Sequence, residues 1–263
     1  MGSIVTRQGI VHYETQGNGP PVILLHGWLG SWTYWQDTMS ALKDQYRTYA
    51  VDFWGFGDSG KPRSGYSVDD FVSLVDQFMD RMGIQAAPIV GHSMGGTVAL
   101  LAAMAHPQRV TKVAVVGSPM DGRSLSFPLR MAGRKPIAFL VWHMPGLLRR
   151  GIRTLSPLLA QDWQRWYEMI LRDLSQTTLE AFLTSIRSLR LTDLRPRLGE
   201  VRVPVLGFYG QKDLIVNPRQ GEVLLQGVPG AESVSLDHCG HFPMLDDPAL
   251  FNGRLMQFLA IPS

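Results

Sequence analysis

The chain of 263 residues predicts an α/β fold in which a mostly parallel central sheet is flanked by helices and interrupted by an all-helical insertion. Short apolar runs alternate with helical patterns through most of the chain, which predicts parallel strands joined by helices on both faces of the sheet. Over residues 119–200 this alternation stops, and Leu-, Arg- and Trp-rich helical stretches broken by prolines replace it. The predicted units are therefore a core of residues 1–118 and 201–263 and a helical cap of residues 119–200.

Each predicted element follows from its local pattern. Apolar or alternating runs between turn residues predict strands at residues 9–16, 20–27, 46–52, 87–91, 110–118, 201–210 and 233–238. Apolar residues spaced three and four apart predict helices at residues 32–43, 67–83 and 94–107, after Asn217-Pro218, and at about 247–260. Ser67 is the expected N-cap of its helix, with Asp69 and Asp70 in the first turn and Gly83 at the end.

The charge of the chain is unevenly distributed. The formal net charge is +3, and residues 119–200 contain 13 Lys and Arg against 7 Asp and Glu, so they contribute +6 and the remainder −3. The sequence has no five-residue basic block and no basic strip interleaved with aromatics, which argues against a nucleic-acid partner. The asymmetry supports treating residues 119–200 as a separate unit.

The sequence also predicts a cellular compartment. Its longest apolar runs are shorter than the roughly 20 residues that a membrane span needs, and its first residues lack the pattern of a secretory signal. The one cysteine, Cys239, excludes an internal disulfide and suits a reducing compartment. We expect a cytoplasmic protein without a membrane span, acting on a small molecule as a monomer or small homo-oligomer.

The segment PIVGHSMGGTVALLAAMA passes from a predicted strand into a predicted helix with no ordinary loop between them, and Ser93 lies at the junction. So abrupt a turn strains the backbone and is tolerated where the neighbours are small. Gly91 and Gly95 complete the pattern G-x-S-x-G, the nucleophile elbow, which exposes the serine hydroxyl at the carboxyl edge of the sheet. The alternative is a glycine-rich turn whose serine merely caps the helix.

A serine nucleophile needs a histidine base. His92 is expected to point away from the serine because of the elbow geometry, and His26 is expected to hold its neighbouring loop. His238 and His241 remain, both after the last predicted strand. We favour His241, since it follows Gly240 where the loop turns back over the sheet edge.

The acid and the oxyanion donors complete the predicted machinery. Asp213 follows the buried strand at 201–210, and Asp121, after the preceding strand, is its competitor. The tetrahedral intermediate needs two backbone donors. We assign them to the N–H of Met94, directly after the serine, and the N–H of Trp28 in the loop HGWLG.

The order Ser93, Asp213, His241, together with the motifs LLHGW, DFWGFGDSG, GHSMGG, GQKD and CGHFPMLDDP, resembles the α/β-hydrolase fold superfamily. It is most similar to the serine-nucleophile esterase and haloperoxidase-like branch with a helical cap, which also includes C–C bond hydrolases. The resemblance covers nearly the whole chain, and it implies that residues 119–200 cover the active site and that Asp52 is structural. The branches with an aspartate at the elbow, the haloalkane dehalogenases and epoxide hydrolases, are excluded by the serine.

The sequence contains no H-E-x-x-H metal pattern, no G-x-x-x-x-G-K-[ST] loop and no dinucleotide fingerprint after its first strand, so we expect no metal and no cofactor. Aromatic residues of the cap are candidates for an apolar substrate pocket above the serine. They are Phe139, Trp142, Trp163 and Trp166. The excess arginine of the cap either forms a solvated outer face or attracts anionic substrates.

These observations predict a carboxylesterase-like serine hydrolase that cleaves esters with apolar acyl or alkyl groups through an acyl-enzyme on Ser93. The same triad could serve lactone or C–C bond hydrolysis, perhydrolysis or acyl transfer, and the motifs do not distinguish these reactions. A third hypothesis, a non-catalytic ligand receptor on the same fold, is disfavoured by the complete triad and both oxyanion positions.

Overall fold

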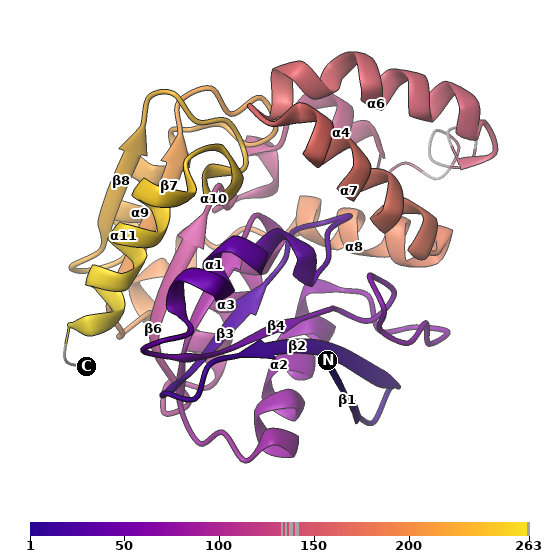
Figure 1. The fold of residues 1–263 in the computed structure, drawn as a ribbon. Helices are drawn as coiled ribbons and strands as arrows, with labels where there is room; N and C mark the ends of the chain where they lie inside the picture. The colour runs from indigo at the N-terminus through magenta and orange to yellow at the C-terminus, as the bar shows by residue number, and fades with distance from the viewer. Residues whose placement is uncertain (133, 135, 137–138, 140–141, 262–263) are drawn as a thin grey trace.

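The computed structural model describes residues 1–132, 134, 136, 139 and 142–261. Within this part of the chain, one eight-stranded sheet has the order β1-β2-β4-β3-β5-β6-β7-β8. The pairs β1–β2 and β2–β4 are antiparallel, and all other neighbours are parallel. The prediction of a mostly parallel sheet flanked by helices is confirmed (Figure 1).

The strands are β1 (Gly2–Val5), β2 (Ile10–Gln16), β3 (Pro21–Leu25), β4 (Arg47–Val51), β5 (Ala87–His92), β6 (Val110–Val116), β7 (Val205–Gly210) and β8 (Glu232–Leu236). The core helices are α1 (Gln36–Leu42), α2 (Val68–Met82), α3 (Met94–Ala105), α9 (Gln220–Gly227), α10 (Pro243–Asp246) and α11 (Pro248–Ala260). The insertion contributes α4 (Phe127–Ala132), α6 (Pro145–Leu159), α7 (Trp163–Gln176) and α8 (Leu179–Leu191). Short 3₁₀ turns are η1 (Trp32–Trp35), η2 (Gly122–Ser124) and η3 (Arg195–Glu200).

The first strand, β1, was not predicted from the sequence. Its four residues, Gly2–Val5, alternate between half-buried and exposed, and they pair antiparallel with β2 at the edge of the sheet. A turn closed by the hydrogen bond from the Thr6 N–H to the Gly9 carbonyl joins the two strands. A four-residue edge strand has too short a pattern to be seen alone, because its pairing with β2 defines it.

The middle of the sheet positions the site. Strands β3 and β5 lie side by side there, and Val22 to Leu25 are fully buried. Because these strands are parallel, their carboxyl ends meet at one edge, together with those of β6, β7 and β8. The loops that follow β3, β5, β7 and β8 therefore meet at this edge.

The helical insertion, residues 119–200, lies over this edge. Figure 1 shows α4, α6, α7 and α8 gathered at one end of the molecule, the end toward which the arrow of β6 points. A β-bridge between Asp121 and Asp193 brings the two ends of the insertion together. Among the described residues, no helix is both long and apolar enough to span a membrane.

Helix α2 begins with the cap that the sequence predicts. The Ser67 hydroxyl accepts a hydrogen bond from the Asp70 N–H at 3.1 Å, and the Asp70 carboxylate accepts one from the Ser67 N–H at 2.9 Å. The helix ends at Gly83, whose φ of 67° is the left-handed conformation that glycine adopts without strain. Both ends of the helix are thus fixed by local chemistry.

Removing the cap should weaken the fold by a measurable amount. We expect Ser67→Ala to lower the free energy of unfolding by about 1 kcal/mol, because N–H groups of the first turn lose their partner. Ser73→Ala, an exposed serine in the middle of the same helix, is the matched control and should change stability by less than about 0.5 kcal/mol. Urea denaturation followed by circular dichroism measures both. Equal effects of the two substitutions would contradict the capping role.

Candidate active site

The chain passes from β5 into α3 through Ser93 alone. Its backbone has φ 51° and ψ −116°, a region that non-glycine residues enter at a cost of about 1–3 kcal/mol. The Ser93 N–H donates to the Val116 carbonyl of β6 at 2.8 Å, which ties the turn to the sheet. A Cβ atom on Gly95 would lie 2.6 Å from the His26 carbonyl oxygen, so α3 approaches this closely because that residue is glycine. The structure therefore has the elbow geometry that the motif predicts.

His241 and Asp213 are hydrogen-bonded, with 2.7 Å between Nδ1 and Oδ2. The other carboxylate oxygen of Asp213 accepts from the N–H groups of Ile215 at 2.7 Å and Val216 at 2.9 Å. Since the carboxylate accepts, Nδ1 of His241 carries the proton and Nε2 is left as the basic nitrogen. His241 and Ser93 are both buried and line the same cavity. The predicted base and the predicted acid are thus paired, and the predicted nucleophile lines the same cavity as the base.

The competing candidates from the sequence have other partners. His238 is half-exposed and pairs with Asp247 at 2.8 Å. The Asp121 carboxylate accepts from the Arg123 N–H at 2.7 Å and lies 3.8 Å from the Arg195 guanidinium. The structure thus brings the favoured histidine and the favoured aspartate together.

His92 does not simply point away from the site, as the sequence led us to expect. It lines the same cavity as Ser93, and its Nε2 lies 2.9 Å from the backbone carbonyl oxygen of His241. A carbonyl can only accept, so Nε2 carries the proton. Burial and the neighbouring His241 ring hold the pKa of His92 well below its usual value of 6.5, so the ring is neutral. His92 thereby fixes the backbone of the residue proposed as the base.

His26 holds the loop after β3, as the sequence predicts. Its Nδ1 lies 2.7 Å from the Gly27 carbonyl oxygen, and its Nε2 accepts from the Phe53 N–H at 3.0 Å. These two bonds require a neutral ring with the proton on Nδ1, and burial lowers the pKa of His26 accordingly. The bond between Phe53 and His26 thus joins the loop that contains Trp28 to the loop after β4.

The two predicted oxyanion donors flank the elbow. Met94 is the first residue of α3, so its N–H is one of the helix donors without an intrahelical acceptor. Trp28 lines the same cavity as Ser93, and its indole donates to the Phe182 carbonyl of the insertion at 3.2 Å. A Cβ on Gly27 would lie 2.7 Å from His92 Nδ1, which explains why a glycine precedes Trp28.

A cavity of about 460 Å³, which we call the chamber, extends from Ser93 into the insertion. Most of its wall is aliphatic. These residues are Leu29, Leu129, Met131, Leu148, Ile152, Leu159, Ile170, Leu174, Leu189 and Ile215. Its volume and apolar lining are typical of a small-molecule site. The chamber suits an apolar chain attached to the group that meets the serine.

The structure separates the four aromatic residues predicted to line the pocket. Trp166 is buried and lines the chamber. Trp142 lines an adjoining cavity and packs edge-on against Phe182, with 5.6 Å between the ring centroids. Phe139 is 58% exposed and borders a separate hollow, and half-buried Trp163 does not occur among the described residues that line the chamber. For these last two the structure gives no support to a place in the pocket wall.

Within the described residues, one group could in principle offer several metal ligands. Ligand atoms of His12, Asp52 and Asp58 lie within 4.8 Å of one another. The Asp52 carboxylate is already engaged, because it accepts from the Trp32 N–H at 2.7 Å and the Asp58 N–H at 3.0 Å and pairs with His12 at 2.9 Å. This is the structural role that the resemblance implies for Asp52. The absence of a metal cofactor stays a prediction.

A buried carboxyl of the insertion, Asp173, was missed by the sequence analysis. It lies on α7 and is fully buried beside the loop after β3. Burial raises the pKa of Asp173 to about 7, and the nearby carboxylates of Asp52 and Asp58 add to the rise, while Ser31 and Arg172 oppose it. Its spacing from the buried residues Trp166 and Ile170, seven and three positions before it, places it on the buried face of the helix and is the signal that could have identified it. This carboxyl is half-protonated near neutral pH.

Comparison with known proteins places the chain in a family. The sequence pattern of the alpha/beta hydrolase fold matches residues 20–248. A pimeloyl-[acyl-carrier protein] methyl ester esterase from Nitrosomonas europaea is 31% identical over 254 residues, which cover 92% of this chain and 96% of that protein.

One further relative and one solved structure are named for reactions other than methyl ester hydrolysis. A 2-hydroxy-6-oxo-6-phenylhexa-2,4-dienoate hydrolase from Burkholderia cepacia is 30% identical over 268 residues, covering 95% of this chain and 91% of the relative. The crystal structure of an enol-lactonase from Burkholderia xenovorans superimposes with a TM-score of 0.84 at 24% identity, covering 98% of this chain and 99% of that one. The second likeness supports the fold alone.

The hydrogen bond from His92 to the His241 carbonyl can be tested by substitution. We expect His92→Leu to lower kcat roughly tenfold, because a buried carbonyl loses its donor and the loop shifts. His92→Gln places an amide N–H close to the position of Nε2 and should recover most of the rate. Ester hydrolysis and thermal unfolding are measured for both variants. Equal losses in the two would show that the hydrogen bond is not what matters.

The raised pKa of Asp173 predicts a pH-dependent stability. Between its unfolded pKa near 3.8 and its folded pKa of about 7, unfolding releases a proton, so the wild type loses stability as pH rises through this window and then levels off. The side chain of Asp173→Asn does not titrate. The free energy of unfolding of this variant, relative to that of the wild type, should therefore rise over this window by at most about 4 kcal/mol. Urea denaturation at several pH values measures the difference.

The matched control for Asp173 is Glu168→Gln, an exposed position on the same helix. Its stability relative to wild type should show no comparable gain between pH 4 and pH 7. A gain of the same size in both variants would assign the effect to the net charge of α7, and a constant difference for Asp173→Asn would show that the buried carboxyl stays ionised.

Proposed function

The chain belongs to the α/β-hydrolase fold family, and from this membership we propose that it is a carboxylesterase-like serine hydrolase acting on esters with apolar acyl or alkyl groups. One observation carries the proposal. Ser93 and His241, which is hydrogen-bonded to Asp213, line the same apolar chamber. The similarity to a methyl ester esterase supports the same reaction class.

In the proposed reaction, Nε2 of His241 takes the proton of the Ser93 hydroxyl as its oxygen attacks the ester carbonyl. Asp213 keeps the imidazole in the required tautomer and stabilises the imidazolium that forms. The N–H groups of Met94 and Trp28 bind the developing oxyanion, aided by the N-terminus of α3. Proton return from His241 releases the alcohol and leaves an acyl group on Ser93, which water then removes by the same steps.

The chamber favours an ester over the dienoate substrate named for one relative. Among the described residues that line it, there is no Asp, Glu, Lys or Arg. A dienoate carries a carboxylate, and burying that charge without a partner is costly. Lactone hydrolysis, perhydrolysis and acyl transfer would use the same triad without burying such a charge, so these activities should be measured beside ester hydrolysis.

Substitutions should show whether activity depends on the proposed triad or on the competing aspartate. We expect Ser93→Ala to lower kcat/KM for a nitrophenyl ester by at least about 10³-fold and Asp213→Asn by about 10²–10⁴-fold, because nucleophile and tautomer control are lost. Asp121→Asn, the competing aspartate, should stay within about twofold of wild type. Full activity in Ser93→Ala, or equal losses in the two aspartate variants, would contradict the assignment.

A further inference from the structure

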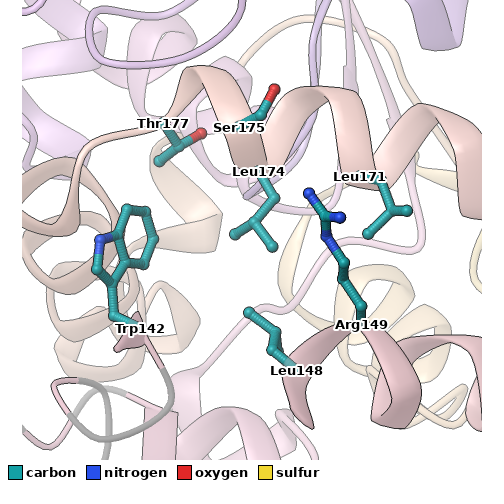
Figure 2. Close-up of a pocket in the computed structure, with 7 residues that line it drawn as sticks. All are labelled: Trp142, Leu148, Arg149, Leu171, Leu174, Ser175 and Thr177. Carbon is teal, nitrogen blue, oxygen red and sulfur yellow. The ribbon is translucent and has the colours of Figure 1, made fainter. Parts of the chain in front are cut away.

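A second cavity of about 230 Å³ lies between α6 and α7 and is lined by Trp142, Leu148, Arg149, Leu171, Leu174, Ser175 and Thr177. We call it the vestibule. Figure 2 shows Arg149 reaching from α6 toward the leucines of α7, with Trp142 on the other side of the cavity. The two hydroxyl residues lie at the end of α7. The vestibule is thus lined by apolar side chains, two hydroxyl residues and one cationic group.

The vestibule adjoins the chamber. Leu148 of α6 and Leu174 of α7 line both cavities, so these two side chains form the partition between them. These leucines separate the two cavities, so a chain that reached from Ser93 to the vestibule would have to pass between them. An extended chain bound at the serine would direct its far end toward Arg149.

The charge of Arg149 is available to a ligand. Arg165 and Arg172 on α7 are paired with Asp37 at 2.7 Å and Asp58 at 3.6 Å. Arg149, by contrast, has no carboxylate partner among the residues that the structure describes. Its helix, PGLLRRGIRTLSPLL, contains three arginines and no acidic residue. Arg149, one of the arginines that give residues 119–200 their excess positive charge, therefore lies at the vestibule.

The hydroxyl groups of the vestibule are already committed as donors. Ser175 donates to the Arg172 carbonyl at 2.6 Å, and Thr177 donates to the Asp173 carbonyl at 2.8 Å. Neither hydroxyl proton is therefore free for an anionic ligand. Arg149 is the donor among the lining side chains that fits an anionic oxygen, since its planar guanidinium can hold a carboxylate or phosphate through two hydrogen bonds.

We propose that the vestibule binds an anionic group at the end of the substrate remote from the scissile ester, with Arg149 as the residue that recognises it. This inference rests on the proposed ester hydrolysis and adds a substrate class, amphipathic esters whose apolar chain ends in a negative charge. The charge stays outside the apolar chamber, where its hydration is kept in part, and the chain fills the chamber. Arg149 is thus a specificity-determining residue.

The experiment compares two series of nitrophenyl esters of increasing chain length. One series ends in a carboxylate and the other in a carboxamide of the same shape without charge. At the length that spans the chamber, the wild type should prefer the carboxylate by about tenfold in kcat/KM, the order of a charge-assisted hydrogen bond. The preference should fall as salt is added, because the guanidinium is partly exposed. A ratio near one at every length would overturn the proposal.

Arg150→Gln is the matched control for Arg149→Gln. Both residues lie on α6 and both substitutions remove one positive charge, but Arg149 lines the vestibule and Arg150 is not among its lining residues. The preference for the carboxylate should vanish in Arg149→Gln and remain in Arg150→Gln. Equal loss in both variants would assign the preference to the general charge of the helix and overturn the proposal.

Two further arms complete the design. Esters that end in a phosphate distinguish the source of the anion, since a stronger dependence of their kcat/KM on Arg149 identifies phosphate as the preferred group. Binding of the carboxylate and carboxamide esters to Ser93→Ala, measured by calorimetry, tests recognition without turnover. If the wild type hydrolyses no ester, the proposed function fails, and the calorimetric preference and its loss in the double variant Ser93→Ala, Arg149→Gln still decide the inference.

Discussion

The site depends on one strained residue, Ser93, which makes the whole turn from β5 into α3 at a positive φ. Such a conformation persists because its surroundings leave no alternative. The strand before it is held between β3 and β6, its own N–H is bonded to Val116, and the helix after it lies against the Leu25 and His26 carbonyls through Gly95. The burial and pairing of the central strands thus stabilise the strained turn and hold the Ser93 hydroxyl in place.

Three buried histidines, His26, His92 and His241, lie around this turn, and each makes different hydrogen bonds. His26 and His92 are neutral hydrogen-bonding groups, since burial lowers the pKa of each, and each has its proton fixed by a carbonyl acceptor. One fastens the loop that carries Trp28, and the other fastens the backbone of His241. Of the three, His241 is the one that pairs with a carboxylate, Asp213, and it lines the cavity that Ser93 lines, as the proposed base requires. The partner of each ring sets its role.

The sequence predicted the parts of the fold whose patterns are local and missed those that depend on distant contacts. The buried strands, the N-cap at Ser67 and the elbow at Ser93 follow from neighbouring residues, so their positions could be predicted. The edge strand β1 exists through its pairing with β2, and the role of His92 depends on a carbonyl 149 residues away. In the insertion, helical periodicity gave no way to choose Trp166 over Trp163, because the two lie three residues apart on α7 and the packing of the helix decides which of them borders the chamber.

Helix α7 both lines the chamber and attaches the insertion to the core. Helix α7 contributes Ile170 and Leu174 to the wall. The same helix is bound to the core through Arg165 to Asp37 at 2.7 Å and Gln176 to Asp58 at 2.8 Å. The partition residue Leu174 and the contact of Gln176 with Asp58 are two residues apart on this helix, so the wall of the chamber and the attachment of the insertion to the core depend on the same stretch of chain.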